Sequence, residues 1–270
     1  MHMQMAALCD FVARHRRFFV LTGAGCSTDS GIPDYRDVDG NWKRSPPVSF
    51  QAFMGSPMVR QRYWARSIVG WQQLHRAGPN GAHEALVRLE KQGRLELLVT
   101  QNVDRLHQAA GNVQVIDLHG RIDRVRCMDC GYLMSREELQ VELLRRNSDW
   151  NKLRGRSAPD GDAELEAPPS GQLTIPSCAR CDGMLKPDVV FFGESVPQPR
   201  VDASMRALER ADAVLVVGSS LMVFSGYRFV RAAAQFGKPI AAVNLGRTRA
   251  DELLTLKVSE PCAQALAAAM

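Results

Sequence analysis

The residue types with the clearest chemical potential in this sequence are four paired cysteines. Cys127 and Cys130 form one C-x-x-C pair, and Cys178 and Cys181 form a second. Two thiolates at this spacing can share one tetrahedral ion, and two such pairs complete a four-thiolate site with no open position. We therefore predict one structural Zn ion per chain, which stabilises a small unit and does no chemistry itself. The alternative is two unrelated redox or packing pairs.

A glycine-rich turn is the second candidate. The apolar run 18–21 is short enough for a buried strand, and Gly23, Ala24 and Gly25 follow it closely. A strand that enters such a turn brings backbone N–H groups to its end, where phosphate is the usual ligand. The pattern is G-A-G without the third glycine of a dehydrogenase fingerprint, so on this feature alone an ordinary strand and turn is an equal alternative.

Small or polar residues recur where predicted strands end. They stand at Thr22-Gly23, Gln101-Asn102, His119-Gly120, Gly218-Ser219-Ser220 and Asn244. If the strands are parallel, these ends lie on one rim of the sheet, where ligands bind. Five such ends predict a long polar ligand with about the reach of a dinucleotide. A histidine on this rim titrates near neutral pH and is a candidate general base, although a hydrogen-bonded core histidine is the commoner role for this residue type.

The elements that must position these residues alternate between strand and helix. Strands are predicted near 18–21, 95–100, 113–118, 213–217 and 239–244, with helices between them. This alternation predicts an α/β fold with a doubly wound, Rossmann-like parallel sheet.

The cysteine pairs lie in a segment that interrupts this pattern. We predict a Rossmann-like domain from residues 1–121 and 185–270, with a helical insertion at about 45–80, and a small zinc-binding domain at 122–184. Residues 155–172 are rich in proline, glycine and acid, which predicts a surface loop. The stretch 185–194 is expected to return to the main sheet as a strand.

Composition limits the possible functions. The chain has 270 residues, is 45% apolar and carries a net charge of +5, with no long basic run, which argues against nucleic-acid binding. No apolar run is long enough to span a membrane. The first residues have helical spacing and run directly into the first strand, so we expect a first helix and not a removed leader, a cytoplasmic location and a monomer.

Six motifs in a fixed order carry a family resemblance. They are GAGCSTDSGIPDYR at 23–36, TQNVDRLH at 100–107, LHG at 118–120, LKPDVVFFGE at 185–194, GSSL at 218–221 and NLG at 244–246. Around a four-cysteine segment, this series resembles the sirtuin family over about residues 15–265. The PDYR, RQRYWAR, PDGD and LKPDVVFFGE stretches look like class II, the branch with the mitochondrial sirtuin described as a lipoamidase and ADP-ribosyltransferase. Tyr35 and Cys26 depart from the commoner family pattern.

The resemblance implies an NAD-dependent protein-lysine deacylase, which transfers the acyl group from lysine to ADP-ribose and releases nicotinamide. It implies that His119 is the base and that Asn102 shares the catalytic role. Arg36 and the N–H groups of Ala24 and Gly25 suit the pyrophosphate, and Tyr35 can shield the reacting face from water. The full set of implied NAD-binding residues is Gly23, Ala24, Gly25, Thr28, Ile32, Pro33, Asp34, Tyr35, Arg36, Trp42, Gln101, Asn102, Val103, Asp104, His119, Gly218, Ser219, Ser220, Asn244, Leu245, Gly246 and Cys262.

The resemblance also implies a binding mode for the acylated protein substrate. The peptide would add as a strand to the extended edge formed by Val190, Phe191, Phe192, Gly193 and Glu194. A plain buried strand is the alternative for this apolar run.

The preferred acyl group depends on a second motif. Tyr63 and Arg66 form a Y-x-x-R pair on a predicted helix, a spacing that one sirtuin branch uses to hold a carboxylated acyl group. A helix face with a packed tyrosine and a solvated arginine explains the pair equally well. Two other functions stay open: a protein mono-ADP-ribosyltransferase that uses NAD, and a non-enzymatic zinc-containing interaction module. The incomplete glycine fingerprint argues against a dehydrogenase.

Overall fold

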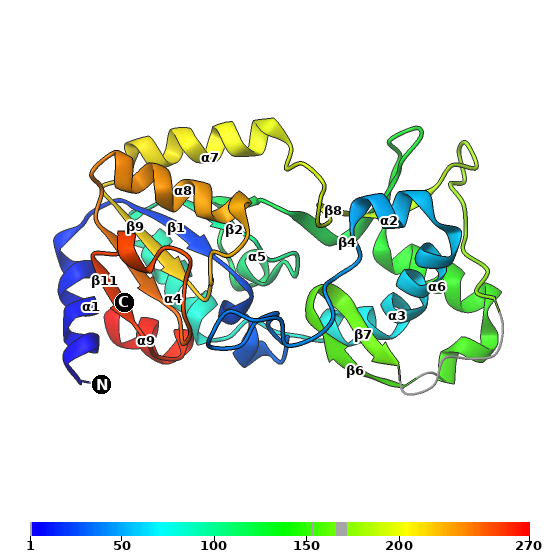
Figure 1. Ribbon diagram of the computed structural model, residues 1–270, viewed down its shortest axis with the longest axis horizontal. Coiled ribbons are helices and arrows are strands. Elements are labelled where there is room, and N and C mark those ends of the chain that lie inside the picture. Colours follow the sequence, from blue (N-terminus) through cyan, green and yellow to red (C-terminus); the bar gives the residue numbers. More distant parts are fainter. Residues whose placement is uncertain (1, 153, 166–171) are drawn as a thin grey trace.

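The computed structural model describes residues 2–152, 154–165 and 172–270, which form a larger and a smaller lobe (Figure 1). The larger lobe contains a six-stranded sheet in the order β11-β10-β9-β1-β2-β3, and all neighbouring strands are parallel. The strands are β1 (Phe18–Thr22), β2 (Leu95–Thr100), β3 (Val115–Asp117), β9 (Ala213–Val217), β10 (Ile240–Val243) and β11 (Leu256–Val258). The strand order reverses between β1 and β9, which is the position where doubly wound sheets bind ligands.

Helices cover both faces of this sheet because its strands are apolar on both sides. In β1, Phe18 and Val20 belong to one core, and Phe19 and Leu21 belong to the other. The helices that contribute to the first core are α1 (His2–Arg14), α4 (Gly81–Lys91) and α9 (Cys262–Ala269), and those that contribute to the second are α7 (Gln198–Arg210) and α8 (Phe224–Gln235). Fully buried parallel strands of this kind need apolar residues at every position.

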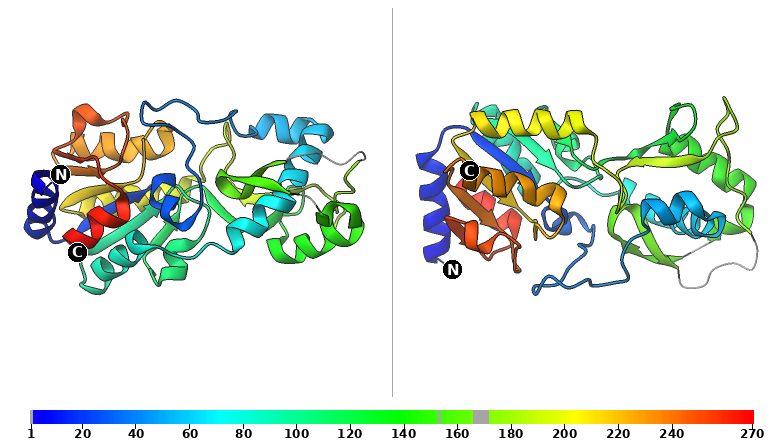
Figure 2. Two further views of the ribbon diagram at one scale, coloured as in Figure 1. Left: turned by 90° about the horizontal axis from the view of Figure 1, so that it is seen from below. Right: turned by 45° about the horizontal axis from the view of Figure 1, so that its top comes forward.

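The smaller lobe has its own antiparallel sheet, helices and core. Its strands, in the order β5-β4-β8, are β5 (Leu133–Ser135), β4 (Gly120–Cys127) and β8 (Leu185–Val189), and β6 (Gly155–Ala158) and β7 (Asp162–Leu165) form a separate hairpin. Its helices are α2 (Phe50–Gly55), α3 (Pro57–His75) and α6 (Arg136–Arg146). The two turned views in Figure 2 show these elements grouped at the end of the molecule away from both termini.

Short helices complete the chain. They are α5 (Leu106–Ala110), which follows β2, and the 3-10 helices at Ala24–Cys26, Thr28–Ser30, Ser148–Lys152, Pro159–Gly161 and Asp251–Leu253.

The main helices and strands agree with the sequence predictions. The predicted helix at 57–76 corresponds to α3, the helix at 136–146 to α6, and the parallel Rossmann-like sheet is confirmed. No helix in the described part of the chain is long and apolar enough to cross a bilayer.

Two expectations were wrong. The strand predicted at 185–194 ends at Val189 and does not join the parallel sheet. It pairs in the antiparallel direction with β4, Gly120–Cys127, in the sheet of the smaller lobe. The predicted surface loop 155–172 contains the β6–β7 hairpin, and its residues 166–171 lie outside the described part. The residue boundaries proposed for the two domains stay a prediction.

Close packing of the hairpin on α3 gives a stability prediction. A Cβ atom at Gly70 would run into the carbonyl oxygens of Gly161 and Asp162. Gly70→Ala should therefore displace the hairpin and lower the free energy of unfolding by about 1–3 kcal/mol, the usual cost of overpacking. Gly78→Ala is the control, since open space surrounds that position. Equal denaturant midpoints for both variants and the wild type would contradict this packing.

Candidate active site

A cavity of about 690 Å³ lies at the carboxyl ends of β1, β2, β9 and β10. It brings together most of the residues predicted from the five strand ends. Those that line it are Gly23, Ala24, Gly25, Thr28, Asp34, Tyr35, Arg36, Trp42, Gln101, Asn102, His119, Gly218, Ser219, Ser220, Asn244, Leu245, Gly246 and Cys262.

Four of the predicted residues do not line this cavity: Ile32, Pro33, Val103 and Asp104. Ile32 and Val103 are buried in the core of the smaller lobe. The Asp104 carboxylate accepts bonds from the Ser27 hydroxyl at 2.7 Å and the Leu106 N–H at 2.9 Å, so it braces the loops from within. Its burial raises the pKa of Asp104.

The glycine turn is shaped by close contact between two strand ends. A Cβ at Gly218, whose φ is 62°, would meet the backbone of Cys26, and a Cβ at Gly23 would meet Ser219. The N–H of Gly25 donates to the Gly218 carbonyl at 2.8 Å. The neighbouring turn thus uses this N–H in the structure, and its contact with a pyrophosphate stays a prediction. Glycine is required here for backbone contact, which the spacing alone did not reveal.

Arg36 is one of the positively charged residues that line the cavity. Its guanidinium lies 3.9 Å from the centre of the Trp42 ring and donates to the Gly40 carbonyl at 2.7 Å. Within the described residues it has no carboxylate partner, and burial lowers the pKa of Arg36. A guanidinium that is held in place but not neutralised is suited to bind phosphate oxygens.

His119 is held in one tautomer. Its Nδ1 lies 2.9 Å from the Gln101 carbonyl oxygen, which can only accept a hydrogen bond, so Nδ1 carries the proton. Nε2 therefore has a lone pair and accepts from the Ser225 hydroxyl at 2.7 Å. Burial, opposed by the Gln101 bond, lowers the pKa of His119 to about 4. The imidazole is thus neutral at physiological pH. Its basic atom, Nε2, is hydrogen-bonded to the Ser225 hydroxyl, which a ligand hydroxyl can replace.

Asn102 is oriented by its own loop. Its amide nitrogen donates to the Gly23 carbonyl and the Ser27 hydroxyl, both at 3.1 Å. Both amide protons are thus used, and the side-chain oxygen is left as an acceptor for a ligand hydroxyl or water.

Tyr35 has a partner that sequence reasoning missed. Its hydroxyl donates to the Asp160 carboxylate, which belongs to the turn of the β6–β7 hairpin. Burial raises the pKa of Asp160 to about 6. Asp160 belongs to the PDGD stretch that the sequence analysis singled out, but that motif does not predict a contact with Tyr35, which lies 125 positions earlier in the chain.

The segment after β8 is less open than the predicted strand edge. The Val190 N–H donates to the His119 carbonyl at 2.7 Å, and the Phe191 N–H donates to the Glu194 carboxylate at 2.8 Å. Glu194 in turn pairs with the buried Lys186 ammonium at 2.9 Å. The side chain of Glu194 thus faces inward and braces residues 190–193, all of which line the cavity.

Tyr63 and Arg66 lie at a second cavity of about 720 Å³, which shares residues 189–192 and Asp160 with the first. Arg66 is not free: its guanidinium makes two bonds to the Asp162 carboxylate, one of them from Nε at 2.7 Å. Tyr63 packs against the Phe53 and Phe191 rings at 5.3 Å. The sequence spacing gave no sign of this internal carboxylate.

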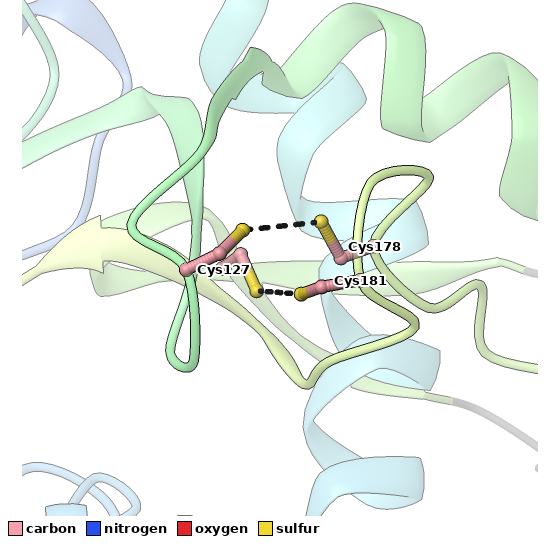
Figure 3. Close-up of side chains that lie close together, drawn as sticks. Cys127, Cys178 and Cys181 are labelled. Carbon is pink, nitrogen blue, oxygen red and sulfur yellow. Dashed lines mark hydrogen bonds between the residues drawn. The ribbon is translucent and has the colours of Figure 1, made fainter.

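The four paired cysteines converge in the smaller lobe (Figure 3). The Cys127 and Cys181 sulfurs are 3.5 Å apart, and the Cys130 and Cys178 sulfurs are 3.7 Å apart. A tetrahedral Zn with Zn–S bonds of about 2.3 Å requires sulfurs about 3.8 Å apart, so the thiols fit the ion. The site is consistent with one structural zinc and offers no open position for catalysis.

Cys26, His83 and His107 form another buried cluster, beneath the glycine turn. Nδ1 of His83 accepts the Asn80 N–H at 3.2 Å, so the proton of neutral His83 is on Nε2. A metal-binding histidine normally donates its second ring N–H. A ring nitrogen that carries a proton cannot bind a metal, so we interpret this cluster as part of the core, in which Nε2 of His83 and Nδ1 of His107 lack a hydrogen-bond partner among the described residues.

The fold and site together define a nucleotide-binding α/β protein with an appended four-thiolate metal unit. Comparison with known proteins gives the family. The chain belongs to the Sir2 family, whose model matches residues 23–225. It is 63% identical to an NAD-dependent protein deacetylase of Xanthomonas campestris pv. campestris (strain 8004), over 97% of this chain and 89% of that relative. It is equally identical to NAD-dependent protein deacetylase 2 of Bradyrhizobium diazoefficiens, over 97% and 96% of the two chains.

Solved structures agree with this assignment. A Sir2 protein in complex with a p53 peptide and NAD⁺ superposes with a TM-score of 0.79 at 29% identity, over 97% of this chain and 95% of that one. A Sir2 protein bound to an acetylated peptide gives a TM-score of 0.75 at 29% identity, with the same coverage. The family is thus established, whereas the class II assignment stays a prediction.

The zinc site yields a prediction of metal content. Wild-type protein should contain one zinc per chain, and Cys178→Ser should lose it and lower the melting temperature, because the apposed thiols then have no ion between them. Cys9→Ser is the matched control, since Cys9 lies on α1, outside the four-cysteine cluster, and its thiol donates to the Ala268 carbonyl at 3.3 Å. Elemental analysis with thermal melting checks this. Zinc-free wild type, or equal zinc loss in both variants, would contradict the assignment.

Proposed function

We propose that this protein is an NAD-dependent protein-lysine deacylase that acts on acylated protein lysines. The observation that carries the proposal is the fixed tautomer of His119, whose Nε2 lone pair faces a cavity at the switch point of the sheet. The names of the relatives and the peptide-bound family structures support the same activity.

NAD⁺ fits the first cavity by chemistry as well as by position. When bound, it supplies the ribosyl carbon that receives the acyl oxygen, with nicotinamide as leaving group. Arg36 would hold the phosphates, and Asn102 and Gln101 would face the ribose hydroxyls. Tyr35, Trp42 and Phe192, whose rings contact one another at 5.7–6.1 Å, wall the site against water.

His119 acts on a hydroxyl proton. A ribose hydroxyl that replaces the Ser225 hydroxyl at Nε2 can transfer its proton to the imidazole, while the Nδ1–H remains bonded to the Gln101 carbonyl. The imidazolium that forms is stabilised by that carbonyl, and later returns the proton. This is general base catalysis with orientation supplied by one backbone bond.

The second cavity suits the acyl chain because it joins the first at residues 189–192. The carboxylate-binding role considered for Arg66 is disfavoured, since Asp162 neutralises its guanidinium. We propose that neutral acyl groups are accepted in preference to dicarboxylic ones. The mono-ADP-ribosyltransferase and the non-enzymatic zinc module have no specific observation in their favour.

His119→Ala tests the catalytic assignment. The variant should lose about 10²–10⁴-fold in kcat for release of the deacylated peptide, the usual value of a general base, with little change in the KM for NAD⁺. Liquid chromatography of nicotinamide and peptide products provides the measurement. Full deacylation by the variant would refute the assignment.

Asp162→Asn tests the acyl preference. Wild type should favour a hexanoyl-lysine over a glutaryl-lysine peptide of the same sequence. Removing the carboxylate leaves Arg66 unpaired, so the variant should gain about tenfold in relative kcat/KM for the glutaryl peptide, as expected for a charge-assisted bond. Arg66→Ala in the same background should abolish the gain. A glutaryl preference already present in wild type would contradict the proposal.

A further inference from the structure

Two arginines lie beside His119 without a carboxylate partner among the described residues. Arg228 belongs to α8 and Arg200 to α7, and each is close enough to help lower the pKa of His119 after burial, the main cause. Arg200 donates to the Leu118 carbonyl at 3.5 Å. Most other half-buried arginines of the site region, such as Arg66, Arg121 and Arg124, are paired with aspartates. Arg228 and Arg36, which both line the cavity, therefore carry positive charge that no carboxylate of the described residues neutralises.

Arg228 is the member of this pair that lines the NAD-sized cavity. It is half-buried, and its Nε is shielded from solvent without any hydrogen-bond acceptor. Ser225 lies one turn earlier on the same helix face and bonds to His119 Nε2 at 2.7 Å. Helical side chains lean toward the helix N-terminus, so the Arg228 guanidinium extends toward the same end of α8 as Ser225.

A buried guanidinium N–H without an acceptor is costly in the free protein, and a ligand that accepts from it gains affinity. A carboxylate matches the planar fork of donors and neutralises the charge in one contact. Arg36 lines the same cavity and is the residue that we propose for the phosphates of NAD⁺. The ligand left for Arg228 is therefore an anion that arrives with the substrate.

We propose that Arg228 binds a carboxylate of the acylated substrate next to the scissile acyl-lysine, and that it thereby makes the enzyme selective for acidic substrate sequences. This inference rests on the proposed deacylase function. The carboxylate belongs to an aspartate or glutamate that flanks the lysine, because the acyl chain leads into the second cavity, where Arg66 is already bound by Asp162.

The experiment uses the whole chain, two sets of peptides and one titration of NAD⁺. In the first set, a hexanoyl-lysine is flanked on either side by glutamate or by glutamine. In the second, the flanks are neutral and the acyl chain is hexanoyl or glutaryl. The third measurement varies NAD⁺ at saturating peptide. The enzymes are wild type, Arg228→Gln, Arg228→Lys and the control Arg231→Gln. Arg231 lies 5.2 Å from the same Phe224 ring as Arg228 but is exposed and outside the cavity.

Wild type should prefer the glutamate peptide to its glutamine counterpart by about tenfold in kcat/KM, mostly through KM, as expected for a charge-assisted bond. Arg228→Gln should abolish the preference without changing the KM for NAD⁺, Arg228→Lys should restore part of it, and Arg231→Gln should retain all of it. A purely structural role for Arg228 would lower kcat/KM for all peptides by one factor.

Each other outcome overturns the inference. If wild type uses the glutamate and glutamine peptides equally well, the proposed subsite does not exist. If Arg228 affects only the preference for the glutaryl chain, the carboxylate that it binds belongs to the acyl group. A raised KM for NAD⁺ alone in Arg228→Gln assigns the arginine to the cofactor. If wild type deacylates no peptide, the proposed deacylase function fails together with the inference about Arg228. If it deacylates the peptides without a preference for glutamate, only the inference about Arg228 fails.

Discussion

The hydrogen bond from His119 Nδ1 to the Gln101 carbonyl is the interaction on which the chemistry of this protein depends. It fixes the ring tautomer, and so leaves Nε2 as the basic atom on the cavity side. Gln101 follows directly after β2, and its N–H donates to the Thr22 carbonyl of β1 at 3.0 Å. The position of one proton is thus set by the register of two parallel strands in the middle of the sheet.

The same dependence on strand ends extends to the rest of the site. The turn after β1 packs on the turn after β9 so closely that neither Gly23 nor Gly218 tolerates a Cβ. Asn102 ties the turn after β2 to the first of these through the Gly23 carbonyl. Because the parallel sheet is buried on both faces, these ends are held rigidly, and a polar ligand that spans them meets groups that are already oriented.

Sequence alone predicted the features that are local and repeated. The two C-x-x-C pairs, the polar strand ends and His119 were recognisable because short motifs place them and because parallel strands bring their ends to one rim. The sequence could not reveal that Asp162 would neutralise Arg66, since these residues are 96 positions apart and meet only after the β6–β7 hairpin packs on α3. The strand at 185–189 was recognised but assigned to the wrong sheet, because an apolar run does not identify its partner strand.

The residues at the carboxyl ends of the parallel strands form the site at which an acyl group passes from lysine to the ribose of NAD⁺. The most direct measurement is mass spectrometry of all products from an acyl-lysine peptide, NAD⁺ and the protein in water enriched in heavy oxygen. The account predicts equal amounts of deacylated peptide, nicotinamide and O-acyl-ADP-ribose. Free acyl acid formed without NAD⁺, or ADP-ribosylated protein without deacylated peptide, would contradict it.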